Sequence, residues 1–193
     1  MNNERTKRER KIALAAGKDL EKGIELTLRK KDDRHLTVHI NERQGTFVTE
    51  EEPGLNVAST AHLPDKMLLE TEKCLKDLLN QSKLTKPSVN KLMDAFKKTN
   101  QWQIFRERHN GREAWDNLKS SFKEHLQHSE GLHSSPYGIV YITGGKDLML
   151  GSVCDFTHWV QETLGRETSL FVGCTMDDSW QQNIEVFMLM AES

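Results

Sequence analysis

Three closely spaced histidines, His125, His128 and His133, are the residues whose type and spacing are best suited to bind a metal. Imidazole nitrogens are common zinc ligands, but the sequence offers no pair of cysteines near them to complete a site. His125 and His128 lie at the end of a predicted helix, where a cationic side chain interacts favourably with the helix dipole. We therefore expect no metal and no other cofactor at these positions.

Cys154 and His158 are four residues apart on a predicted helix, a spacing at which an imidazole can activate a thiol. The simpler interpretation is that Cys154 packs beside Val153. The other two cysteines, Cys74 and Cys174, are far from it in the sequence, and widely spaced cysteines are typical of reduced thiols in a cytosolic protein. We expect no catalytic residue here and a cytoplasmic location.

Gly144 and Gly145 follow an apolar segment and precede a predicted helix, so their backbone N–H groups could form an anion-binding nest. The interpretation that we favour is structural. The glycine pair shapes a turn, and Asp147 lies near the start of the helix, where negative charge is favourable.

The elements that position these residues are clearest after residue 137. Residues 138–142 are a nearly continuous apolar run, as expected of a strand covered on both faces. Two further strands are predicted at 169–173 and 184–190, joined by a polar turn at 176–179. The helix between the first two strands carries apolar residues at Leu150, Val153, Phe156, Val160 and Leu164. This order predicts an α/β (α+β) layer.

The centre of the chain is predicted to be helical. One helix runs from about residue 65 to residue 81 and a second starts near Pro87, each with apolar residues on one face. A short strand at 102–105 precedes a capping box, with Asn110 as N-cap and Glu113 reaching back. The helix after the box places on one face Trp115, Leu118, Phe122 and Leu126.

The N-terminal part has a different organisation. Residues 1–23 are predicted to be a basic, mobile arm, in which residues 12–16 could extend a helix. Residues 24–64 alternate apolar and polar side chains in two segments, which predicts a small β-hairpin region, a further short strand at 47–48 and a linker. Residues 65–83 form a connecting helix, and residues 84–193 form the C-terminal domain.

Composition excludes several classes of protein. The 193 residues carry 27 Lys and Arg against 29 Asp and Glu, a net charge of −2, so no overall positive charge attracts nucleic acid. A nucleic-acid-binding factor that uses the basic arm and the helix with Lys91, Lys97 and Lys98 is our weakest alternative. No apolar run reaches the roughly 18 residues of a membrane-spanning helix, and no apolar stretch follows the basic N-terminus to make a secretory signal.

Residues 138–148, Gly-Ile-Val-Tyr-Ile-Thr-Gly-Gly-Lys-Asp-Leu, resemble the strand and turn that open the C-terminal half of FtsZ, the bacterial tubulin homologue. Further matches follow in order: an apolar strand ending in glycine at 170–173, Asp177 in an acidic turn, and a final strand at 186–191. The resemblance covers about residues 84–191. It implies an FtsZ-like C-terminal domain, with a mixed sheet packed against helices.

Two departures from the family bear on function. FtsZ binds GTP through a glycine-rich loop in an N-terminal domain, whereas the glycines of residues 1–83 stand alone. In the family, a loop before the helix at residue 89 supplies two acidic residues to the neighbouring subunit's nucleotide. Thr85 and Ser88 stand at those positions here, with Lys86 beside them. The resemblance therefore implies a protein that is not an enzyme.

The function implied in this way is a non-catalytic interaction module that modulates or caps the assembly of FtsZ-type filaments in cell division. A subunit that offers one face of a head-to-tail assembly and lacks the other ends the filament. The partner would be FtsZ or a second copy of the chain, bound through Thr85, Lys86, Ser88 and Asn90. A scaffold or adaptor that reuses the fold is the main alternative.

Overall fold

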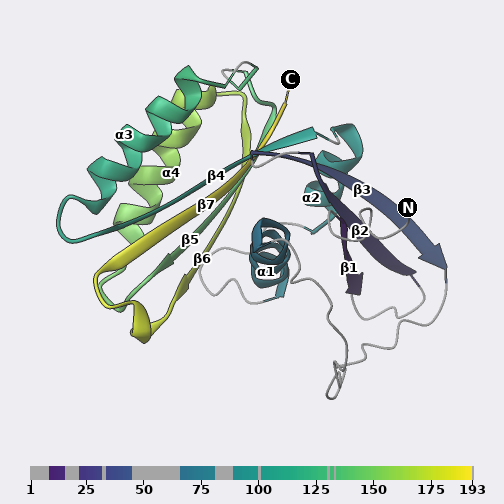
Figure 1. Cartoon of the computed structure of the whole chain (residues 1–193), viewed down its shortest axis with the longest axis horizontal. Coiled ribbons are helices and arrows are strands. Elements are labelled where there is room, and N and C mark those ends of the chain that lie inside the picture. The colour runs from purple at the N-terminus through teal and green to yellow at the C-terminus, as the bar shows by residue number, and fades with distance from the viewer. Residues whose placement is uncertain are drawn as a thin grey trace.

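The computed structural model describes residues 9–15, 22–31, 34–44, 66–80, 89–99, 101–129, 131–132 and 134–192. In this part of the chain, seven strands form one sheet in the order β1-β2-β3-β4-β7-β5-β6, with helices on both of its faces (Figure 1). The elements are, in chain order, β1 (Glu9–Ala15), β2 (Lys22–Lys30), β3 (His35–Gln44), α1 (Lys66–Asn80), α2 (Val89–Lys98), β4 (Gln101–Asn110), α3 (Ala114–Gln127), β5 (Tyr137–Gly144), α4 (Leu150–Leu164), β6 (Ser169–Met176), the short 3₁₀ helix η2 (Asp178–Trp180) and β7 (Asn183–Ala191).

The C-terminal half of the sheet is mixed. β4 and β5 lie on either side of β7 and run antiparallel to it, and β6 pairs with β5 in parallel. A parallel pair requires a crossover connection, which α4 supplies. The predicted mixed sheet packed against helices is confirmed, and β5, β6 and β7 occur where the apolar runs predicted strands.

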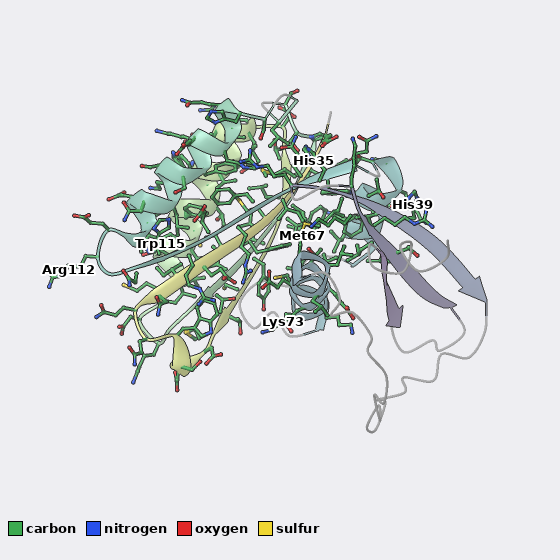
Figure 2. The ribbon with its side chains drawn as sticks, in the orientation of Figure 1. His35, His39, Met67, Lys73, Arg112 and Trp115 are labelled. Carbon is green, nitrogen blue, oxygen red and sulfur yellow. The ribbon has the colours of Figure 1, made fainter. Side chains whose placement is uncertain are left out.

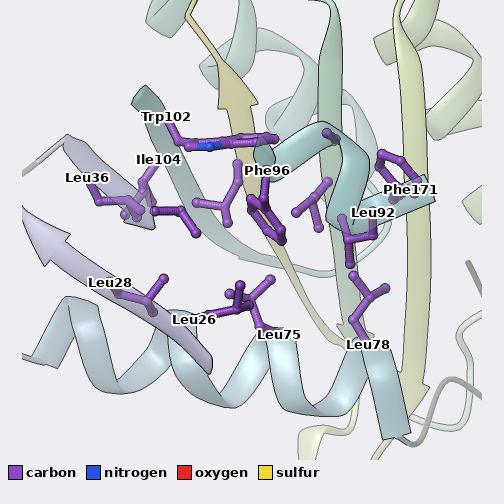
Figure 3. Close-up of a cluster of buried hydrophobic side chains, with 14 of the residues drawn as sticks. Leu26, Leu28, Leu36, Leu75, Leu78, Leu92, Phe96, Trp102, Ile104 and Phe171 are labelled. Atoms are coloured by element: carbon purple, nitrogen blue, oxygen red, sulfur yellow. The ribbon is translucent and has the colours of Figure 1, made fainter. Parts of the chain in front are cut away.

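The sheet separates two hydrophobic cores. On one face, α3 and α4 bury Phe122 and Phe156. On the other face, α1 and α2 bury Leu75 and Phe96, and the ring of Phe96 lies 5.0 Å from the fully buried ring of Trp102 in β4 (Figure 3). Burying each such side chain contributes about 1.5–3 kcal/mol to folding. No helix within the described ranges is long and apolar enough to cross a membrane.

The N-terminal hairpin continues the same sheet. β1, β2 and β3 pair antiparallel, and the start of β3 pairs with the start of β4, where Leu36 lies opposite Trp102. Leu26 and Leu28 of β2 are fully buried in the core beneath α1 and α2. The hairpin is thus present as predicted. The predicted linker and the strand predicted at 47–48 lie outside the described residues.

Two local predictions are wrong. Residues Glu9–Ala15, predicted as part of a mobile arm with a helix near 12–16, form strand β1, because pairing along β2 outweighs the helix propensity of the alanines. Asn110 is not an N-cap but the last residue of β4, opposite Asn183. α3 instead begins after Glu113, whose side chain makes no capping hydrogen bond. Pairing with β7 therefore extends β4 through the predicted cap.

Candidate partner-binding surface

The partner-binding residues predicted from the family's loop cannot be placed against this fold. Thr85, Lys86 and Ser88 lie outside the described residues, and of Asn90 the structure describes only the backbone, in the first turn of α2. Their role in partner binding stays a prediction. Gly144, Gly145 and Asp147, which were predicted to shape a turn, are all described. Gly144 is the last residue of β5, and the other two lie between β5 and α4.

The turn between β5 and α4 packs directly against the turn between β6 and β7. A Cβ atom on Gly145 would lie 1.7 Å from the carbonyl oxygen of Gln181, far inside van der Waals contact. The N–H of Asp177 donates to the carbonyl oxygen of Gly144 at 3.0 Å, and the N–H of Leu148 donates to that of Gly145 at 3.0 Å. A residue without a side chain is therefore required where the two turns meet.

Asp147 is exposed in this turn, three residues before α4 begins. The residue at the N-cap is Met149, and no side chain caps the first N–H groups of the helix. Asp147 therefore lies near the start of the helix, as predicted, but its carboxylate does not cap the helix.

The turn between β6 and β7 is stabilised by its own side chains. The carboxylate of Asp177 accepts hydrogen bonds from the hydroxyl of Ser179 at 2.6 Å and from its backbone N–H at 2.9 Å. These two bonds hold the pKa of Asp177 below its usual value. The guanidinium of Arg108 lies 4.1 Å above the ring of Trp180, and the side-chain amide of Asn183 donates to the carbonyl of Trp180. Both turns are thus well ordered by contacts within the chain.

A cavity of about 400 Å³ opens where these two turns meet the loop between β4 and α3. Arg112 and Trp115, which come from that loop and from the start of α3, lie at this end of the molecule (Figure 2). Asp147 and Ser152 line it from the side of α4. Three segments distant in sequence therefore build one hollow at the end of the sheet.

Large apolar side chains are exposed at the same end. Met149 is 69% exposed, and Leu150 and Met176 are each 49% exposed. Among the described residues only one other large apolar side chain is comparably exposed, Leu69 on α1. We call Met149, Leu150 and Met176, together with Arg112 and Trp115 of the cavity, the loop-end surface.

The sequence did not reveal this surface. Leu150 was predicted to lie on the buried face of its helix, but as the first residue of α4 it lies at the end of the helix, where the core does not cover it. The signal that could have found the surface is the pair Met149 and Leu150, adjacent apolar residues directly after a glycine turn. Only one of two neighbours on a helix can face the core.

Of the three closely spaced histidines, His125 and His128 lie within the described residues. The pKa of His125 is lowered to about 4, first by burial and then by the positive charge of the nearby Arg34. The Nδ1 atom of His128 lies 2.8 Å from the carbonyl oxygen of Glu124, and His133 lies outside the described residues. Within the described ranges, no three His, Cys, Asp or Glu side chains come close enough to hold a metal ion.

The cysteines differ from one another in exposure. Cys154 is exposed on α4, so the prediction that it packs beside Val153 is wrong, and the nearby His158 lies 3.6 Å from Glu162 instead. Burial raises the pKa of Cys74 to about 12 and also raises the pKa of Cys174. Protonated thiols are poor nucleophiles, so neither of these two cysteines is an activated one.

Comparison with solved structures identifies the fold. A mutant of FtsZ from M. jannaschii superposes with a TM-score of 0.58 over 65% of this chain, at 14% sequence identity. The chain has an FtsZ-like fold. An empty FtsZ dimer from M. jannaschii gives the same TM-score, coverage of this chain and identity. The FtsZ-like resemblance first found at residues 138–148 is confirmed as a fold.

The likeness has clear bounds. This chain covers 38% of the length of the first FtsZ chain and 36% of the second, and 14% identity establishes the fold alone. No protein-family model matches the chain, and no curated protein matches it in sequence. What the FtsZ-like fold does in this protein is therefore a matter for proposal.

Proposed function

We propose that this protein is a non-catalytic, FtsZ-like interaction module that modulates or caps the assembly of FtsZ-type filaments. The observation that supports the proposal is the loop-end surface: on an FtsZ-like fold, Met149, Leu150 and Met176 are exposed together at one end of the sheet. Apolar side chains exposed as a group are typical of sites where another protein binds. The partner is FtsZ itself or a second copy of this chain.

The rigidity of the two turns favours such binding. The close approach of Gly145 to Gln181 and the hydrogen bonds of Asp177 hold the apolar side chains on a defined backbone. A surface that is already ordered loses less conformational entropy when a partner binds. Binding at the loop-end surface would therefore require little rearrangement of this chain.

The capping part of the proposal follows from the resemblance to one half of FtsZ. The glycines of residues 1–83 are isolated, and Thr85 and Ser88 replace the acidic residues of the family's catalytic loop. We infer that the chain neither binds nor hydrolyses GTP. A subunit that joins a head-to-tail filament without presenting the next nucleotide face stops its growth.

The experiment is light scattering of FtsZ from the same cell, polymerised with GTP and titrated with this protein. We expect shorter or fewer polymers at substoichiometric ratios, because one bound cap is enough to block one filament end. The double variant Met149→Lys, Leu150→Lys should abolish the effect by placing two charges on the apolar surface. Lys86→Asp tests the contact predicted from sequence in the same assay.

Leu69→Lys is the matched control, because Leu69 is also an exposed apolar residue but lies on α1. It should act like the unaltered protein. If stoichiometric amounts of the unaltered protein leave FtsZ polymers unchanged, the filament role is wrong. If Leu69→Lys is as damaging as the double variant, the loop-end surface is not the contact.

An adaptor that reuses the fold is the second candidate. One observation favours it: the FtsZ-like match covers 65% of the chain, and β1 to β3 extend the sheet beyond β4. If the unaltered protein, with its loop-end surface intact, has no effect on FtsZ polymers, the adaptor is the better-supported function.

A further inference from the structure

The outer edge of β4 is covered over only part of its length. β3 pairs with β4 where Leu36 lies opposite Trp102, and the last bond between them runs from the N–H of Ile104 to the carbonyl oxygen of Arg34 at 2.7 Å. β3 begins at His35 and pairs only with the first residues of β4, so beyond this bond it no longer lies alongside β4, which continues between α1 and α3 (Figure 1).

Backbone alternation identifies the groups on this edge. In an antiparallel strand the N–H and C=O of one residue point to the same side, and those of the next residue to the other. Because the N–H of Ile104 points to β3, the backbone groups of Arg106, Arg108 and Asn110 also point away from β7. Nothing in the described part of the chain pairs with the backbone groups of these three residues. Unpaired edges of this kind are templates for another strand.

A cavity of about 670 Å³ lies along this edge. Residues on both faces of β4 line it, from Ile104 to Glu107, so the cavity extends around the edge of the strand. Met67 of α1 forms one wall and Ser121 of α3 the other. His125 also lines it, and its buried Nε2 atom has no hydrogen-bond partner among the described residues.

The charges along the edge select the occupant. On the α3 side, the cavity is lined by two carboxylates, Glu107 and Glu124, and by one guanidinium, that of Arg34, so negative charge is in excess there. The side chain of Glu107 is 45% exposed. On the α1 side, Glu185 accepts hydrogen bonds from both Arg106 and Arg108, so the charges there are largely neutralised. An incoming strand therefore gains most from basic side chains on the α3 side.

A second copy of this chain fits poorly. When two β4 edges pair antiparallel about a two-fold axis, the residue opposite Glu107 is Phe105, Glu107, His109 or Gly111, depending on the register, and none of these is a lysine or arginine. A second Glu107 in that position would destabilise the strand pair, because like charges directly opposite each other repel. Charge thus favours a different polypeptide.

We propose that the edge of β4 beyond Ile104 is a docking site for an extended strand of a partner protein, with Lys or Arg at alternate positions facing Glu107 and Glu124. The strand joins the sheet through the backbone groups of Arg106 and Arg108, and its other side chains face α1. The cavity at this edge shares no lining residue with the cavity of the loop-end surface, so either site can fail without the other.

The probe is the peptide Ac-Thr-Lys-Val-Lys-Val-Lys-Thr-NH₂, titrated into the full chain and followed by backbone amide NMR. When the peptide pairs antiparallel to β4 and its lysines face Glu107 and Glu124, the N–H groups of its valines point toward β4 and those of its lysines point away; parallel pairing would reverse the two sets. N-methylation of both valines should weaken binding by at least about tenfold, since two hydrogen bonds are lost. N-methylation of two lysines is the matched control and should change affinity by less than about twofold.

Substitutions in the protein test the same site. Arg108→Pro removes an edge N–H without breaking the ladder to β7, and it should weaken binding at least about fivefold relative to Arg108→Ala. Glu107→Lys should also weaken binding, whereas Glu167→Lys, exposed between α4 and β6, should not. The proposal is wrong if the peptide does not bind, or if both methylated peptides bind equally well. The peptide pair decides the question even if Arg108→Pro does not fold.

Discussion

At the scale of single residues, Gly145 has the most demanding position in the described structure. The carbonyl of Gln181 occupies the place that its Cβ atom would take. The neighbouring Gly144 is less constrained, because its Cβ would lie 3.1 Å from the side chain of Leu148, which can shift. One glycine thus sets the distance between the two turns of the loop-end surface.

Gly145→Ala should therefore lower the free energy of unfolding by about 1–3 kcal/mol, the usual cost of forcing extra atoms into a packed site. Gly151→Ala is the control, because nothing lies within 4 Å of its Cβ position in α4. That substitution should raise stability by about 0.5–1 kcal/mol by favouring the helix. Urea denaturation measures the free energy of unfolding of both variants. Equal effects of the two substitutions would contradict the conclusion that Gly145 has no room for a side chain.

His125 is the residue whose burial predicts a pH dependence. Its pKa is lowered from 6.5 to about 4 in the folded chain, so the unfolded chain binds the proton first. Stability should fall as the pH drops from about 6.5 to about 4 and then stay level as far as this residue is concerned. Because the ring is only partly buried, we expect a loss of about 1–2 kcal/mol over this range.

His125→Gln should remove this part of the pH dependence, whatever its effect on stability at pH 7. The control is His158→Gln, because His158 is exposed on α4. Urea denaturation at several pH values gives the slope. A slope that is unchanged in His125→Gln would show that another group causes it.

At the scale of elements, one carboxylate links β4 and β7. The side chain of Glu185 is 12% exposed and accepts from Arg106 at 2.8 Å and from Arg108 at 3.2 Å. Arg106 also donates to Glu70 on α1. The network therefore joins β4 and β7 to α1 in the part of β4 that β3 does not cover.

Glu185→Gln should destabilise the fold by about 1–3 kcal/mol, since it leaves two guanidinium groups short of a partner in a partly buried place. Glu107→Gln, on the opposite face of β4 and 45% exposed, should cost less than about 0.5 kcal/mol. Thermal or urea denaturation distinguishes the two. A larger effect at Glu107 would mean that the network contributes little to stability.

At the scale of the whole molecule, the hairpin and the FtsZ-like part share one core. Leu26, Leu28 and Leu36 pack in the same cluster as Phe187 and Leu189 of β7. Elements that share buried side chains in this way tend to unfold together.

Leu28→Ala should lower stability by about 2–5 kcal/mol and should reduce the protection of β5 amides as well as those of β2. Hydrogen exchange under native conditions measures this residue by residue. Loss of protection confined to β1, β2 and β3 would show instead that the hairpin unfolds on its own.

The elements that depend on local pattern could be predicted from the amino-acid sequence alone. The apolar run at 138–142, the helical spacing of Val153, Phe156 and Val160, and the alternation in the hairpin each reflect a period of side-chain burial that a short segment carries alone. The turn at Gly144 and Gly145 was predictable because a glycine pair between a strand and a helix is itself a local signal. The likeness to FtsZ rests on the resemblance of residues 138–148.

Which segments meet depends on contacts between residues far apart in the sequence. β1 is a strand because β2 offers it an edge, and β4 passes through the predicted cap at Asn110 because β7 continues to pair with it. The exposure of Leu150 and the open edge at Arg106 depend on where the core ends and where β3 begins, and no local pattern records that. Burial and strand pairing are contacts between distant residues, so the two candidate binding surfaces became visible only in the folded chain.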